Sequence, residues 1–181
     1  MKPETLKELL EKIGNVRIAI IGDFCLDAYW FVDESKREIS IETGKPTTPV
    51  SIQKYSLGGA GNVASNLASL GAGQIWALGV TGRDPFASEM ISLMESAGIN
   101  TDYLLTQETS WSTHVYIKPH IGETEQSRID FGNFNRLSEE TAVSLLASLE
   151  KVSKEASLVI INQQVLSGIH TPFFRKKLVD V

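Results

Sequence analysis

The chain has 181 residues, 42% of them hydrophobic, and a formal net charge of −5. This apolar content is enough for a folded core, and scattered Lys and Arg in an acidic chain argue against a nucleic-acid or anionic-membrane partner. No apolar run reaches the length of a membrane span and the N-terminus lacks the apolar core of a signal peptide, so we expect a cytoplasmic protein.

Helix-like and strand-like segments alternate in the first half of the chain. Residues 4–13 have the spacing of an amphipathic helix, and the β-branched run 16–21 predicts a buried parallel strand that ends at Gly22-Asp23. We expect Asp27 just past that edge. The alternating stretch 49–55 is typical of a half-exposed antiparallel strand.

The run Leu57-Gly58-Gly59-Ala60-Gly61-Asn62 opens directly into a helix expected over 62–70. Glycines without a Cβ let a ligand approach the backbone, and the first turn of the helix offers unpaired N–H groups. The run is either a ligand-binding corner that includes Gly58, Gly59 and Asn62, or an ordinary turn before a packing helix.

Further strands and helices are predicted in the second half. Asp84 and Pro85 have the residue types of a helix start, and Ser138 is an N-cap candidate for another helix. A hairpin is expected around Gly122, and a buried strand should end at Asn162. The segments are a strand over 74–79, a helix over 85–97, a strand over 103–105, a hairpin from 112–119 and 125–131, a helix from 138, a strand over 157–161 and a last helix from 171.

This alternation predicts an α/β fold, with helices on the faces of a mainly parallel sheet and a small added β-sheet. Ligands of such sheets bind at the carboxyl edge of the strands. The polar and glycine residues expected to converge there are Asp23, Asp27, Gly58, Gly59, Asn62 and Asn162.

Metal and thiol chemistry have little support in the sequence. Cys25 is the only cysteine, which excludes an intrachain disulfide and indicates a packing role. The three histidines His114, His120 and His170 lack the spacing of metal ligands, so we expect no metal site built by this chain.

Three motifs together resemble the PfkB, or ribokinase, family of carbohydrate kinases, and most closely its sugar and heptose-phosphate kinase branch. They are residues 22–27, the glycine run with its continuation through Val63-Ala64, and residues 68–72 leading to 79–84. The resemblance implies a ribokinase-like three-layer α/β/α sandwich with a small β-sheet lid. It also implies that Asp27 and Asn62 hydrogen-bond sugar hydroxyls while the sugar lies against Gly58 and Gly59.

In this family a lid covers the acceptor sugar and often forms a dimer interface, so the resemblance implies a homodimer through the lid. The lid strands are expected within 28–55 and 112–131. Arg128 is a candidate contact for a phosphate or carboxylate on the sugar. The plausible lid residues are Tyr29, Trp30, Val50, Ile52, His114, Tyr116 and Arg128.

Asn162 and Gln164 are candidate contacts for an uncharged hydroxyl, with Asp23 a weaker candidate. The heptose-kinase branch tends to carry an aspartate and a lysine near this point, and the run 162–168 has neither. This difference argues against a heptose phosphate as the substrate.

The resemblance implies ATP and Mg²⁺ as cofactors, yet the family's Gly-Ala-Gly-Asp-type motif with the aspartate base is not in this sequence. We therefore expect residues 1–181 to be the N-terminal part of one domain, with the nucleotide-binding half and catalytic aspartate beyond residue 181. Such a part would be inactive alone and would leave an apolar sheet edge exposed after Ile161.

Two alternatives remain open. The chain could be a non-catalytic sugar-binding or oligomerisation module. It could also be a dinucleotide-binding domain, because Gly59-x-Gly61-x-x-Ala64 fits the Rossmann pattern formally, although that motif should follow a buried core strand.

Overall fold

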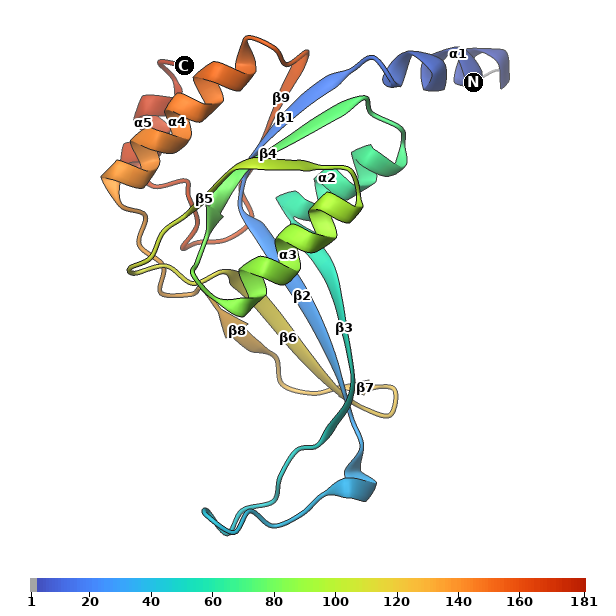
Figure 1. The fold of residues 1–181 in the computed structure, drawn as a ribbon, viewed down its shortest axis with the longest axis vertical. Helices are drawn as coiled ribbons and strands as arrows, with labels where there is room; N and C mark the ends of the chain where they lie inside the picture. Colours follow the sequence, from blue (N-terminus) through green and yellow to red (C-terminus); the bar gives the residue numbers. More distant parts are fainter. Residues whose placement is uncertain (1–2) are drawn as a thin grey trace.

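The computed structural model describes residues 3–181, and within them the chain forms two β-sheets with helices packed around them (Figure 1). The first sheet is parallel throughout, with strand order β5-β4-β1-β9. Its strands are β1 (Arg17–Gly22), β4 (Gln74–Thr81), β5 (Asn100–Thr106) and β9 (Leu158–Asn162). The predicted α/β architecture is confirmed.

The central strand β1 sends alternate side chains into two hydrophobic cores. Ile18 and Ile20 belong to one core, and Ala19 and Ile21 belong to the other. Because successive side chains of a strand point to opposite faces, a strand covered on both faces reads as a continuous apolar run. That is the pattern from which this strand was predicted.

Helices cover both faces of the first sheet. The helices are α1 (Pro3–Ile13), α2 (Ala60–Ser69), α3 (Pro85–Ser96), α4 (Glu139–Ser153) and α5 (Pro172–Leu178). Helices α2 and α3 lie on one face, while α4 and α5 lie on the other (Figure 1). Within residues 3–181, none of these helices combines the length and the apolarity that a membrane crossing requires.

The helix starts follow the local sequence. The Asp84 carboxylate accepts a hydrogen bond from the Ala87 N–H at 3.1 Å, and the Ser138 hydroxyl accepts one from the Thr141 N–H at 3.0 Å. These contacts satisfy N–H groups that a helix leaves unpaired in its first turn. Both predicted caps are confirmed.

The second sheet packs one face against α2 and α3, and it contains both parallel and antiparallel strand pairs. Its strand order is β3-β2-β6-β7, with β8 paired to β6. The strands are β2 (Phe24–Val32), β3 (Val50–Gly59), β6 (His114–Ile121), β7 (Thr124–Glu125) and β8 (Ile129–Phe131), with a 3₁₀ turn η1 (Glu34–Lys36) between β2 and β3. Leu26, Ala28, Val115 and Ile117 are buried in the core that also contains α2 and α3 side chains.

Asp27 follows the end of the first strand, as predicted, but it is part of another strand. The chain breaks only at Asp23 and then enters β2. Asp27 therefore lies inside β2, on a different sheet from β1. The alternation of a half-exposed strand is missing from β2, because its residues are apolar or aromatic at every position except Asp27.

Two further boundaries differ from prediction. Gly58 and Gly59 belong to the end of β3, so the helix begins at Ala60 rather than Asn62. Strand β9 was predicted as a buried strand, but it lies at an edge of the described sheet, where Leu158 is 48% exposed and Ile161 is 55% exposed. This agrees with the exposed apolar edge expected near Ile161. The apolar run of β9 reflects a β-branched strand paired on one side with β1.

Candidate functional site

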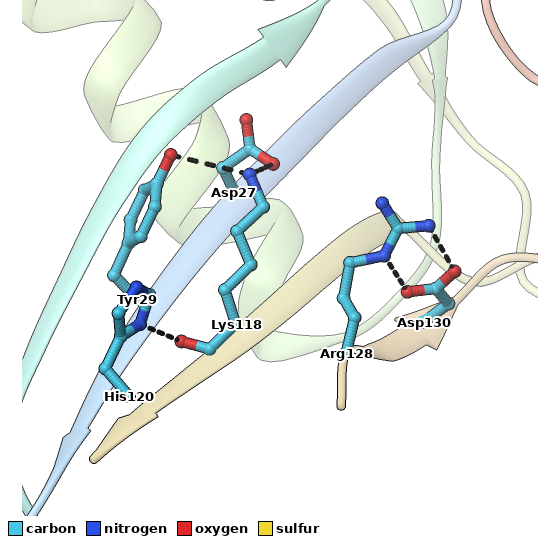
Figure 2. Close-up of polar contacts among 6 residues, drawn as sticks. All are labelled: Asp27, Tyr29, Lys118, His120, Arg128 and Asp130. Carbon is cyan, nitrogen blue, oxygen red and sulfur yellow. Dashed lines mark hydrogen bonds and ion pairs between the residues drawn. The ribbon is translucent and has the colours of Figure 1, made fainter. Parts of the chain in front are cut away.

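One face of the second sheet carries polar and charged side chains, and we call it the polar face. It carries Asp27 and Tyr29 from β2, Lys118 from β6, and Arg128 and Asp130 from β8 and the residues just before it (Figure 2). Tyr116, two residues before Lys118 on β6, lies on the same face. Their sequence neighbours Leu26, Ala28, Val115 and Ile117 point to the buried side. The two-residue repeat of a strand therefore places these six side chains opposite α2 and α3.

Asp27 is held on this face by an ion pair. Its Oδ1 lies 2.9 Å from Nζ of Lys118, and the two side chains are 21% and 19% exposed. A Cβ added to Gly58 would lie 3.1 Å from Oδ2 of Asp27. Gly58 therefore leaves room for this carboxylate against the backbone of β3.

Arg128 forms a second charged pair on the same face. Its Nε and Nη2 donate to the two carboxylate oxygens of Asp130 at 2.6 and 2.7 Å, and its guanidinium lies 4.4 Å from the ring centre of Tyr116. The hydrogen bonds that Arg128 donates to Asp130 raise the pKa of Arg128, so the guanidinium stays charged. The same bonds lower the pKa of Asp130.

A cavity of about 350 Å³ opens between the polar face and the loop after β9. Tyr116, Arg128 and Asp130 line one side, and Gln164 and Ser167 line the other. Tyr116 is paired in register with Asp27, so the Asp27 carboxylate lies on the strand next to this cavity. Arg128 and Gln164, two candidate contacts from the sequence, therefore line the same cavity.

Asp23 serves the fold in this structure. Its carboxylate accepts backbone hydrogen bonds from Gln164 at 2.9 Å, Val165 at 3.2 Å and Ile169 at 2.9 Å, and the residue is 2% exposed. A buried carboxylate with three donors is well satisfied. Asp23 therefore fixes the loop that forms one wall of the cavity, and the geometry does not favour its predicted contact with sugar.

The backbone conformation by itself requires glycine at position 59, apart from any role in a ligand site. Gly59 has φ 55° and ψ −132°, and an added Cβ would collide with the backbone oxygen of Asp23. That oxygen also accepts from the N–H of Ala60 at 2.9 Å. Because only glycine adopts this conformation readily, the crossing of β3 into α2 depends on Gly59.

Asn62 and Asn162 are placed less favourably than predicted. Asn62 is exposed in the first turn of α2, and its Oδ1 is 3.4 Å from Nδ2 of Asn66. Asn162 ends β9, and its Oδ1 is buried without a hydrogen-bond partner among the described residues. Both lie near strand or helix ends, but no contact joins either one to Asp27 or Arg128 in the part of the chain described.

His114 is a core residue. It is 2% exposed, its Nε2 lies 3.3 Å from Nδ2 of Asn135, and its ring packs edge-on against Trp111. Burial lowers its pKa, against an opposing effect of the Asp23 charge, so the imidazole is neutral near pH 7. Its packing leaves it without the exposed face that a ligand contact needs.

Cys25 also belongs to the core, as predicted. It is fully buried, and burial together with the nearby charges of Asp23 and Asp27 raises its pKa to about 12. A thiol with this pKa stays protonated and is a poor nucleophile.

Sequence reasoning missed Lys118, Asp130 and Ser167. The alternation of His114, Tyr116 and Lys118 along one strand could have placed Lys118 on the polar face. The register that sets Lys118 beside Tyr29 was not visible in the sequence, because residues 33–113 lie between β2 and β6.

The dinucleotide-binding alternative does not fit this geometry. Its motif should follow a buried parallel strand, whereas Gly59 ends β3, which pairs antiparallel with β2 at the edge of the second sheet. The described residues also contain no group of three or more His, Cys, Asp or Glu side chains that could hold a metal ion.

Sequence comparisons identify relatives along most of the chain. D-β-D-heptose 7-phosphate kinase of Bordetella bronchiseptica is 34% identical over 121 residues, which cover 67% of this chain and 37% of that protein. The bifunctional protein HldE of Aliarcobacter butzleri is 33% identical over 175 residues, covering 96% and 35%. The chain thus spans little more than a third of the length of these relatives.

Comparison with solved structures supports the fold. Ribokinase from Giardia lamblia superposes with a TM-score of 0.52 at 20% identity, over 81% of this chain and 42% of that one. Escherichia coli phosphofructokinase-2, in a tetrameric inhibited form, gives 0.57 at 19% identity, over 81% and 45%. The ribokinase-like α/β fold expected from the sequence is confirmed.

A family model described as pfkB family carbohydrate kinase matches residues 16–174. The match takes in all four strands of the first sheet, the whole second sheet and the cavity between Arg128 and Gln164. The chain therefore belongs to the pfkB family of carbohydrate kinases.

Proposed function

We propose that this chain supplies the acceptor side of an ATP-dependent sugar kinase and that the second sheet is the lid over the sugar. The observation that carries the proposal is the Asp27 carboxylate, which is fixed against Gly58 on a polar face beside a cavity. Carboxylates fixed in this way accept hydrogen bonds from sugar hydroxyls. Exclusion of water by a lid would protect the transferred phosphoryl group from hydrolysis.

Arg128 is the basic residue that lines the cavity, and because Asp130 lines it too, a phosphate on the acceptor would take the place of Asp130 at the guanidinium. Arg128 presents a planar, permanently charged guanidinium at the cavity wall, and guanidinium groups bind phosphate through paired hydrogen bonds. The curated relative from Bordetella bronchiseptica acts, by its name, on a heptose 7-phosphate. We therefore propose a sugar phosphate as the acceptor, although the run 162–168 lacks the aspartate and lysine expected for the heptose branch.

ATP is the phosphoryl donor in this proposal, with Mg²⁺ as its partner. The chain has no Gly-Ala-Gly-Asp-type motif, and its described residues include no cluster of metal-binding side chains. We assign the nucleotide, the metal and the aspartate base to other segments of the complete protein. The residues described here would bind and orient the sugar.

The complete protein, assayed with ATP and a panel of sugars and sugar phosphates, tests this function. We expect turnover of a phosphorylated sugar, and we expect Asp27→Ala to raise the KM for the sugar much more than the KM for ATP. Asn62→Ala tests the weaker assignment in the same way. Sugar binding without turnover would instead support the non-catalytic module, and equal changes in both KM values would contradict the role of Asp27.

The role of Arg128 has its own measurement. Arg128→Gln should lower kcat/KM for phosphorylated sugars more than for the same sugars without phosphate, because it removes the charge at the cavity wall. Arg83→Gln is the matched control, since Arg83 is exposed and pairs with Glu108 away from the polar face. Equal losses for both kinds of sugar would argue against a phosphate contact.

A homodimer through the lid and a cytoplasmic location remain proposals. Strand β3 forms an edge of the second sheet, and most of its side chains before Leu57 are exposed. A second copy could cover this edge. Sedimentation of the complete protein, with charged substitutions on β3 as a comparison, would detect such a dimer and its loss.

A further inference from the structure

Lys118 occupies a position on the polar face that no family motif in this sequence includes. It extends from β6 across to β2, where its Nζ lies 2.9 Å from Oδ1 of Asp27 and 3.4 Å from the Tyr29 hydroxyl (Figure 2). The same ammonium lies 4.9 Å from the centre of the Tyr29 ring. Three contacts with β2 therefore hold one flexible side chain in one place.

The backbone also restrains this lysine. Lys118 is paired in register with Tyr29, and its carbonyl oxygen lies 2.9 Å from Nδ1 of His120. The His120 ring packs near the rings of Tyr29 and Phe31 at 6.1 and 5.3 Å. The far end of the sheet thus supports the position from which Lys118 reaches Asp27.

The ion pair gives the two oxygens of Asp27 different surroundings. Oδ1 is engaged by Lys118, whereas Oδ2 lies against Gly58, where an added Cβ would be only 3.1 Å away. Among the described residues, no protein hydrogen bond to Oδ2 accompanies the ion pair to Oδ1. One oxygen is therefore tethered while the other is presented beside a glycine.

Lys118 remains charged under these conditions. Partial burial lowers its pKa, but the hydrogen bond and charge of Asp27, with a smaller effect of Tyr29, raise the pKa above the ordinary value overall. A charged ammonium at hydrogen-bond distance fixes a carboxylate more firmly than a neutral donor does.

We infer that Lys118 is a positioning residue for the acceptor sugar, because its ammonium fixes Oδ1 of Asp27 and leaves Oδ2 to accept from a sugar hydroxyl. This inference rests on the proposed function. An untethered aspartate samples several rotamers, and the sugar would then have to order the carboxylate as it binds. The tether removes that cost before the sugar arrives.

The test uses the complete protein and four variants: Lys118→Met, Lys118→Arg, Asp27→Asn and the double variant Lys118→Met/Asp27→Asn. We expect Lys118→Met to raise the sugar KM about tenfold, equivalent to about 1.4 kcal/mol, with little change in the KM for ATP. Lys118→Arg, which keeps a cation at the same reach, should restore most of the affinity. Melting temperatures establish that each variant is folded.

The double variant separates a role through Asp27 from a direct one. If Lys118 acts by fixing Asp27, Lys118→Met should cause no further rise in the sugar KM once Asp27 is already Asn. Lys54→Met is the matched control, because Lys54 is an exposed lysine on the neighbouring strand β3 and lies 5.4 Å from the Phe31 ring. It should leave the sugar KM unchanged.

Each other outcome overturns the inference. An unchanged or lower sugar KM in Lys118→Met would show that the lysine is dispensable or competes with the sugar for Asp27. Additive effects in the double variant would show that it acts independently. If Asp27→Asn itself leaves the sugar KM unchanged, the proposed acceptor site fails as well, and that result distinguishes failure of the site from failure of the lysine's role alone.

Discussion

Replacement of Gly59 by alanine should strongly destabilise the fold, and the structure gives two reasons. Gly59 has φ 55° and ψ −132°, which costs a residue with a Cβ about 1–3 kcal/mol. The new Cβ would also collide with the backbone oxygen of Asp23 and lie 3.1 Å from Sγ of Cys25. Overpacking of this kind costs about 1–3 kcal/mol, and a backbone atom cannot relieve it by changing rotamer.

The two contributions give an expected loss of about 4 kcal/mol for Gly59→Ala, a large part of the roughly 5–15 kcal/mol that stabilises a typical domain. Gly122→Ala is a matched control. Gly122 has nearly the same φ, +59°, but no heavy atom lies within 4 Å of its added Cβ. It should lose only about 1–2 kcal/mol, from backbone strain alone.

Urea unfolding followed by circular dichroism, with the same protein length for each variant, measures both free energies of unfolding. The difference between the two variants reports the collision with Asp23 together with any extra strain from the ψ of −132° at Gly59. If Gly59→Ala loses no more stability than Gly122→Ala, a Cβ at position 59 does not collide with the backbone oxygen of Asp23, and the prediction is refuted. The predicted ligand role of Gly59 would then again be the better reason for glycine at this position.

Three further predictions concern buried polar groups. Asp23→Asn should lower the free energy of unfolding by about 3 kcal/mol, because an amide nitrogen replaces one carboxylate oxygen that accepts from Gln164, Val165 or Ile169. A lower melting temperature would show this loss, and an unchanged melting temperature would contradict it. Cys25 should react with iodoacetamide at pH 8 only after unfolding, since its pKa is raised to about 12, and rapid modification of the folded protein would disagree. His114 has a lowered pKa in the folded state, so below about pH 6.5 the unfolded state binds more protons and the stability should decrease as the pH is lowered. The melting temperature of His114→Gln should therefore change less between about pH 7.5 and 5.5 than that of the unmodified protein. An equally large change in the variant would count against this role of His114.

Much of the first sheet could be read directly from the chain. The apolar run of β1 and the cap residues Asp84 and Ser138 depend on neighbours only a few positions away, and such local preferences survive folding. The buried residues of α4 also follow from the sequence, because they recur at the three- and four-residue spacing of a helix face. Motifs around the glycine run were sufficient to indicate the family.

The site depended on contacts that no local pattern contains. Asp23 was a weaker candidate for a sugar contact, and its three backbone donors, which lie 141 to 146 residues further along the chain, make its carboxylate the support of a loop. Asp27 belongs to β2, a strand that was not identified from the sequence, and the parallel pairing of β2 with β6 brings Lys118 to it. Side-chain types and spacing specify which residues can bind a sugar, whereas strand register and long-range pairing specify which of their atoms remain free to do so.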